Sequence, residues 1–115
     1  MAFKNFLKEN CDVLFIWSEE KNKWLKGNKD RNFKGFEDVV LAILKGKLLD
    51  ILENLNYPNQ YVLVVDLDDY IYAVPTLLEV EDDGEDCLII FEFKTLFPSR
   101  KLFRKYRGHK DEKTF

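Results

Sequence analysis

The sequence predicts an α+β fold: a small antiparallel sheet, two N-terminal helices packed on one face of it, and a short basic C-terminal helix. Three observations predict this class. An apolar stripe with helical spacing lies in the first half of the chain, apolar runs separated by turn residues fill the second half, and a cationic segment follows a helix-capping serine. With 115 residues, of which 46% are apolar, the chain has the size of one domain with its own core.

The first half of the chain predicts a strand and two helices. Residues 13–17 form a short apolar strand, and Ser18 followed by two glutamates is typical of a helix start, because serine caps free N–H groups and acids suit the positive end of a helix. The second helix is predicted by an apolar stripe of Phe36, Val39, Val40, Ile43 and Leu44. Gly46 follows where a left-handed cap would end it. Trp17 and Trp24 are expected in the core.

The second half predicts strands joined by tight turns. The strands cover residues 48–52, 60–66, 70–78 and 87–97, the first of them weakly. Residues 79–86 are expected to form an exposed loop that turns at Asp83-Gly84. Ser99 is expected to cap the last helix over residues 100–106.

One domain is expected over residues 13–107, with residues 1–12 as an N-terminal extension and 108–115 as a polar tail. Cys11 and Cys87 form no CxxC pair and lie far apart in the sequence. Because the predicted core is large and residues 1–12 show no signal-peptide pattern, we expect two free thiols. No apolar run has the length of a membrane span, so we expect a soluble, cytoplasmic protein with no membrane contact.

Charge is unevenly distributed along the chain, although the net charge is only −3. Residues 79–86 contain six acids and no base, residues 94–110 contain seven Lys or Arg and no acid, and residues 21–34 contain six Lys or Arg against one acid. Nucleic-acid binders are often basic overall, so the net charge by itself argues against that class. A polyanion interacts with the charge of the surface that it contacts rather than with the net charge of the whole chain. The two basic stretches therefore favour a polyanionic partner.

The C-terminal basic stretch has the strongest functional pattern. Two rows of cations lie on the predicted helix: one is Arg100, Arg104 and Arg107, and the other is Lys101 and Lys105. Because the last strand ends where this helix begins, Lys94 and Arg100 are expected to converge over one site, where guanidinium groups suit a phosphate. The alternative is a solvated helix with cations near its negative end.

The second basic stretch, residues 21–34, is expected to supply backbone contacts to RNA through Lys21 and Lys26, or else to be an ordinary exposed helix and loop. No cofactor or metal site is expected. The acidic loop does not fit a calcium-binding loop, because Ile90 stands where a glutamate is required. Asp66, Asp68 and Asp69 suit a tight turn better than a metal site, and a single histidine, His109, argues against zinc.

Several segments resemble the BrnT-like toxins of the RelE superfamily, in the same order along the chain. The segments are Phe15–Trp17 followed by Glu20–Asn22, then Phe36–Val40, Tyr57–Gln60, Tyr72–Pro75, and Lys94–Lys101 followed by Arg104, Lys105 and Tyr106. Together they cover about residues 13 to 107. The chain departs from the family in its middle strands, where Gln60, Asp66 and Tyr72 replace arginines, and in its long acidic hairpin.

The resemblance implies a RelE-like fold and the toxin of a type II toxin–antitoxin system. Such a toxin is a metal-independent endoribonuclease, in which the ribose 2′-OH attacks the adjacent phosphate. Its partner is an antitoxin from an adjacent gene, often a ribbon-helix-helix protein, and DNA is bound only through that antitoxin.

On this interpretation the catalytic candidates are Lys94, Arg100, Arg104 and Tyr106, and the RNA-binding candidates are Lys21, Lys26, Tyr72, Lys101 and Lys105. The identity of the general base stays open. The alternative function is a non-catalytic RNA- or protein-binding module of the same fold.

Overall fold

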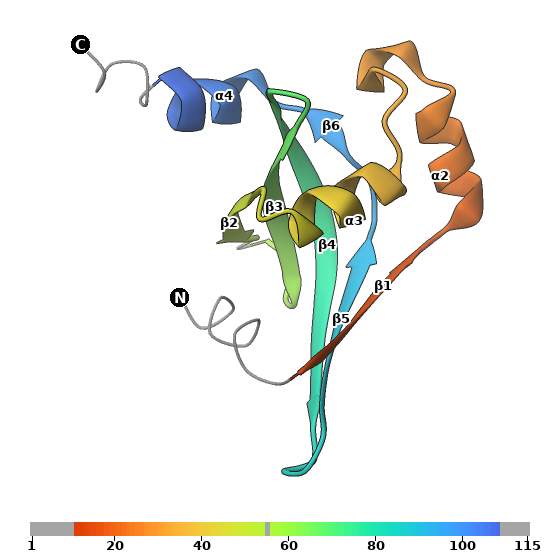
Figure 1. Cartoon of the computed structure of the whole chain (residues 1–115), viewed down its shortest axis with the longest axis vertical. Coiled ribbons are helices and arrows are strands. Elements are labelled where there is room, and N and C mark those ends of the chain that lie inside the picture. Colours follow the sequence, from red (N-terminus) through yellow and green to blue (C-terminus); the bar gives the residue numbers. More distant parts are fainter. Residues whose placement is uncertain (1–10, 55, 109–115) are drawn as a thin grey trace.

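The computed structural model describes residues 11–54 and 56–108, and for residues 107 and 108 only the backbone. These residues form an α+β fold with a six-stranded mixed sheet and three α-helices (Figure 1). The strands are β1 (Asp12–Trp17), β2 (Leu48–Glu53), β3 (Gln60–Leu67), β4 (Tyr70–Asp82), β5 (Cys87–Phe93) and β6 (Phe97–Pro98). The helices are α2 (Glu19–Lys26), α3 (Phe36–Leu44) and α4 (Arg100–Phe103), with a 3₁₀ turn η1 (Lys29–Arg31) and a π-helical turn η2 (Arg104–Gly108).

The sheet is larger than predicted and is not purely antiparallel. Its strand order is β1-β5-β4-β3-β2, and β6 pairs with β4 beside this path. The pairs β2/β3, β3/β4 and β4/β5 are antiparallel, whereas β1 lies parallel to β5, with Asp12 opposite Leu88 and Trp17 opposite Phe93. A parallel neighbour requires a long connection, and the whole chain between β1 and β5 supplies it here.

The helix ends follow the local sequence signals. The Ser18 hydroxyl accepts a hydrogen bond from the Lys21 N–H at 3.2 Å, and Gly46 ends α3 with a φ of 77°, as predicted. The buried Asn22 joins the two helices, because its amide donates to Glu37 at 2.9 Å and its oxygen accepts the Phe36 N–H at 2.7 Å. Asn22 therefore ties α2 to the start of α3.

The core lies between the helices and one face of the sheet. From the helices it takes Leu25, Phe36, Val39 and Ala42, and from the strands Ile51, Leu63, Val65, Leu67, Tyr72, Val74, Leu78, Ile89, Phe91 and Phe93. Trp17 packs against this cluster, with its ring stacked on Phe93 at 6.0 Å, as expected of a core residue. Trp24 was predicted to be in the core but is 48% exposed, because its position on α2 turns it outward.

The last strand and the last helix differ from their predicted bounds. β5 ends at Phe93, and the chain then steps along β4, so that β6 pairs near the start of β4 with Tyr72 opposite Pro98. Lys94 bridges the step by donating its N–H to the Pro75 carbonyl at 2.9 Å. β4 itself continues to Asp82, because its cross-strand pairs with β5 reach into the acidic segment. The helix predicted over residues 100–106 is α-helical only to Phe103 and π-helical from Arg104.

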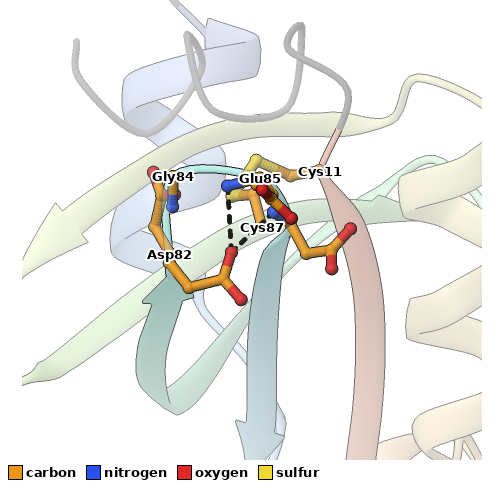
Figure 2. Close-up of a disulfide and its surroundings, with 7 residues drawn as sticks. Cys11, Asp82, Gly84, Glu85 and Cys87 are labelled. Atoms are coloured by element: carbon orange, nitrogen blue, oxygen red, sulfur yellow. Dashed lines mark hydrogen bonds between the residues drawn. A yellow bond between two sulfur atoms is a disulfide. The ribbon is translucent and has the colours of Figure 1, made fainter.

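Cys11 and Cys87 form a disulfide, which corrects the prediction of free thiols (Figure 2). The parallel pairing of β1 with β5 explains it, since Asp12 lies opposite Leu88 and the residues just before them are neighbours. The two cysteines are 76 residues apart in the sequence, and their proximity could not be predicted without the pairing of β1 with β5. The bond lies next to the acidic β4–β5 turn, beside Asp82 and Glu85.

Within the ranges described, no helix has the length and apolar character needed to cross a membrane.

Candidate nucleic-acid interface

Two segments that carry cations flank the start of β4. On one side, the Ser99 N–H donates to the Ile71 carbonyl at 3.0 Å, and the Phe103 ring of α4 stacks on Tyr70 with centroids 4.6 Å apart. On the other side, the loop that follows η1 reaches β4 through Asn32, whose amide donates to the Tyr72 hydroxyl at 2.7 Å. In Figure 1 both segments lie at the upper end of the molecule, with β6 between them. We call this region the basic end.

The cations of α4 and η2 are solvent-facing and uncompensated. The described cations are Arg100, Lys101, Arg104 and Lys105, and all four side chains are exposed. Within the described residues none of them takes part in an ion pair. The segment contains no acid, so its positive charge faces solvent unneutralised. The side chain of Arg107 lies outside the described residues.

The basic residues of α2 and η1 are more constrained. Lys26 pairs with Glu37 at 3.5 Å, and Lys34 is bound to Asp68 at the β3–β4 turn. Lys21 lies over the Trp24 ring at 4.5 Å from its centroid, where a cation–π contact stabilises it. The predicted RNA contacts from Lys21 and Lys26 stay predictions, and the ion pair of Lys26 lowers the charge it presents to a ligand.

The acidic segment lies at the opposite end of β4. This strand has 13 residues, which places its two ends about 40 Å apart at the rise of an extended strand. Residues 79–86 are exposed as predicted, and the turn is closed by backbone N–H groups that donate to Asp82 and Asp83. These bonds from Asp86 and Glu85 lower the pKa of Asp83, so the turn keeps its negative charge. The six acids of residues 79–86 therefore lie at the end of β4 that is remote from α4, whereas the β3–β4 hairpin at the near end carries Asp66, Asp68 and Asp69 (Figure 1).

Tyr106 and Asp50 form a polar contact next to the basic row. The Tyr106 hydroxyl donates to the Asp50 carboxylate at 2.7 Å. Partial burial and this carboxylate raise the pKa of Tyr106 to about 12, so its proton is retained at neutral pH. Asp50 pairs with Val64 in β3, which pairs with Ala73 in β4, and these three positions lie on the sheet face that does not face the core with α2 and α3. The contact between Tyr106 and Asp50 therefore places η2 over that other face.

Two of the predicted catalytic residues are already engaged in the structure. Lys94 pairs with Glu92 at 3.2 Å, two residues before it on β5, and Tyr106 is bound to Asp50. Convergence of Lys94 with Arg100 stays a prediction, since no contact of either residue joins them. Arg100 and Arg104 are exposed on α4 and at the start of η2.

Tyr72 was predicted to contact RNA, and this is wrong. Its side chain is 1% exposed, and its hydroxyl is occupied by Asn32, so it cannot stack on a base. The prediction failed because Tyr72 faces the helices in the strand alternation, and β6 covers the neighbouring edge of β4.

Sequence reasoning missed Asp50 and Asn32, and it placed Arg31 in the second basic stretch without its contact to Leu96. Asp50 is the polar position between apolar neighbours in a strand that was predicted only weakly. Arg31 donates from Nε to the Leu96 carbonyl at 3.2 Å and lies 5.1 Å from the Trp24 centroid. Its position depends on this contact with Leu96, which lies 65 residues later in the sequence, and no local pattern predicts such a contact.

In the part of the chain that the structure covers, no group of three or more His, Cys, Asp or Glu side chains is arranged to hold a metal ion. His109 lies outside the described residues.

Comparison with known proteins found no matching family model, no matching curated protein and no matching solved structure.

Proposed function

We propose that this protein binds RNA at the basic end and cleaves it there, as the toxin of a type II toxin–antitoxin system. The observation that carries the proposal is that Arg100, Lys101, Arg104 and Lys105 are exposed and form no ion pair within the described residues, while the acids of residues 79–86 lie at the far end of β4. Such a field attracts a polyanion and orients it toward the basic end. The proposal also includes a RelE-like fold and membership of residues 13–107 in the BrnT-like toxins that they resemble.

The proposed cleavage requires no metal. The ribose 2′-oxygen attacks the adjacent phosphorus, the bond to the 5′-oxygen breaks, and the products carry a 2′,3′-cyclic phosphate and a free 5′-OH. The protein has to hold the phosphate in line and neutralise its growing charge. We assign this role to Arg100, with Lys94 in support, and the binding of flanking phosphates to Arg104, Lys101 and Lys105.

Tyr106 is proposed to orient the leaving oxygen. Its single hydroxyl proton is donated to Asp50 at rest, and once Asp50 has accepted the 2′-OH proton the Tyr106 hydroxyl is free to donate a hydrogen bond to the leaving oxygen, where negative charge develops. Asp50, held at 2.7 Å from its hydroxyl, is the carboxylate that we propose as acceptor of the 2′-OH proton. The 5′-oxygen takes a proton from solvent water, and Asp50 returns the proton it accepted to solvent, so the step is balanced in protons.

The partners follow from the same proposal. An antitoxin encoded by an adjacent gene would cover the basic end, and DNA would be bound only through that antitoxin. We place the reaction in the cytoplasm, where its RNA substrate is found. Thiols are kept reduced in that compartment, so Cys11 and Cys87 are expected to be at least partly unpaired there.

The proposal is tested by incubating the purified protein with RNA in EDTA. Cleavage to cyclic-phosphate ends is expected, and Arg100→Ala should abolish cleavage and growth arrest while the far-ultraviolet circular dichroism stays unchanged. Arg31→Ala is unsuitable as a variant because Arg31 also holds the Leu96 carbonyl. Undiminished growth arrest by the Arg100→Ala variant would remove the assignment.

A second function is favoured by one observation. Lys94 is neutralised by Glu92, and Tyr106 is bound by Asp50, so two of the proposed catalytic groups already have partners. The same basic end would then serve a module that binds RNA without cleaving it. In the EDTA assay this module retains RNA and releases no product.

A further inference from the structure

Phe33 is an exposed aromatic side chain held in an unfavourable backbone conformation. Its φ is 59°, in the left-handed region, and the preceding Asn32 has a φ of 54°. Asparagine tolerates this region, but a bulky aromatic residue rarely adopts it. The side chain is also 60% exposed, so burial of the ring does not offset the cost of the backbone. The fold alone would be served better by glycine or asparagine at this position.

The loop that carries Phe33 is held firmly in place. The Phe33 N–H donates to the Asn28 carbonyl at 3.1 Å, and the Lys34 N–H donates to the Arg31 carbonyl at 3.0 Å. The Asn32 amide is bound to Tyr72 in the core. The ring is therefore presented to solvent by a fixed backbone, and within the described residues it makes no ring–ring or cation–ring contact.

The surroundings of Phe33 are cationic. Arg31, two residues before it, uses Nε to bind the Leu96 carbonyl and rests over Trp24, which leaves the other donors of its guanidinium group for a ligand. Lys29 in the same turn is exposed. Residues 21–34 contain six Lys or Arg and one acid, so this surface complements a negatively charged ligand.

We infer that Phe33 is a stacking platform for an unpaired base of RNA, with Arg31 and Lys29 binding the neighbouring phosphates. Single-stranded nucleic acid is bound by this combination of an aromatic face and nearby cations. The inference rests on the proposed function and narrows it: the RNA must be single-stranded at the Phe33 loop, because a paired base has no free face to offer. The loop that carries Phe33 follows η1, which contacts β6, so an RNA strand bound at this loop would continue toward α4 (Figure 1).

The experiment measures binding separately from cleavage. Fluorescence anisotropy follows a labelled single-stranded 2′-O-methyl oligoribonucleotide, which lacks the attacking hydroxyl, and its duplex with the complementary strand, both in EDTA. The test variant is Phe33→Asn, which removes the ring and suits the left-handed backbone, so folding is not at risk. Phe33→Trp keeps an aromatic face. Tyr57→Asn is the matched control, because Tyr57 is 61% exposed in the turn between β2 and β3, away from the basic end.

Phe33→Asn should weaken single-strand binding by about tenfold or more, the loss expected for one stacked base, and leave duplex binding unchanged. Phe33→Trp and Tyr57→Asn should bind as the original chain does. Arg104→Ala should weaken binding of both forms, because it removes a phosphate contact alone.

The inference is overturned if Phe33→Asn binds the single strand normally, or if it weakens single strand and duplex alike. It is also overturned if the variant loses only its affinity for the protein encoded by the adjacent gene, which would assign Phe33 to a protein interface. Cleavage of unmodified RNA is scored separately. If Phe33→Asn weakens single-strand binding but the original chain does not cleave RNA, the stacking role of Phe33 stands and the nuclease function is refuted. If the chain cleaves RNA and Phe33→Asn has no effect on binding, the nuclease function stands and the stacking role is refuted.

Discussion

Replacing Cys11 and Cys87 by serine is expected to lower the free energy of unfolding by about 4.5 kcal/mol. The disulfide closes a loop of 76 residues, and restricting such a loop in the unfolded chain corresponds to about 15 cal/mol/K, or about 4.5 kcal/mol at 25 °C, in the chain-entropy model. This is a large part of the stability of an ordinary domain of about 5–15 kcal/mol. The disulfide is therefore expected to decide how stable the protein is in a reducing compartment.

The native structure should survive the loss of this bond, because β1 has other contacts with the sheet. Phe15 packs on Phe91 and Phe93 with ring centroids 5.3 and 5.7 Å apart, and six register pairs join β1 to β5. Since the effect lies mainly in the unfolded state, the double variant should show native near-ultraviolet circular dichroism and a lower midpoint of urea unfolding.

The assay is urea unfolding of the original chain with and without dithiothreitol, beside the double serine variant. Reduction should shift the original chain to the stability of the variant and leave the variant unchanged. Equal midpoints for the oxidised chain and the variant would refute the reasoning. A native-like midpoint with lost near-ultraviolet signal would show that β1 depends on the bond in the folded state instead.

Three further predictions concern the basic end and the helix pair. Arg104→Ala should flatten the dependence of single-strand RNA affinity on salt by about 0.7 in a plot of log K against log salt, as expected when one phosphate contact is lost, whereas an unchanged slope would place Arg104 away from the RNA. Between about pH 10 and 12 the folded state keeps the Tyr106 proton, because its pKa is raised, while the unfolded chain releases it. The free energy of unfolding of the original chain, measured with urea, should therefore fall as the pH rises through that window, and it should fall less in Tyr106→Phe. Asn22→Ala should cost about 3 kcal/mol in thermal unfolding, because it leaves the Phe36 N–H buried without an acceptor and removes a bond to Glu37, and a cost below about 1 kcal/mol would contradict this role.

Sequence patterns predicted elements better than they predicted how the elements meet. The Ser18 cap, the helix predicted from the apolar stripe and the left-handed Gly46 are local signals, and the structure confirms them, although Leu44 of that stripe is 71% exposed and Ala42 is buried in its place. The parallel pairing of β1 with β5 was not predicted, because it joins residues more than 70 positions apart through a register that no local pattern encodes. The disulfide was missed for the same reason.

The basic character of the candidate site was predictable, but its exact composition was not. Charge counts located the basic stretches, and the exposure of Arg100 and Arg104 agrees with a solvent-facing interface. Tyr72 was misassigned because its burial depends on β6, which returns to the edge of β4 after an irregular step. Asp50 was overlooked because it becomes relevant only when Tyr106 is brought to β2.

The net charge conceals the property that the proposed function depends on. A charge of −3 suggests weak repulsion of RNA, yet the acids of residues 79–86 lie about 30–40 Å from the start of β4, several Debye lengths away at physiological salt. At that distance they hardly weaken the attraction of α4 for a phosphate, but they repel RNA that approaches from the wrong end. Neutralising these acids to amides should therefore raise the net charge toward positive values and leave the affinity for short single-stranded RNA nearly unchanged. A strong gain in affinity would mean that the RNA reaches the acidic turn, and the interface would then have to extend along β4.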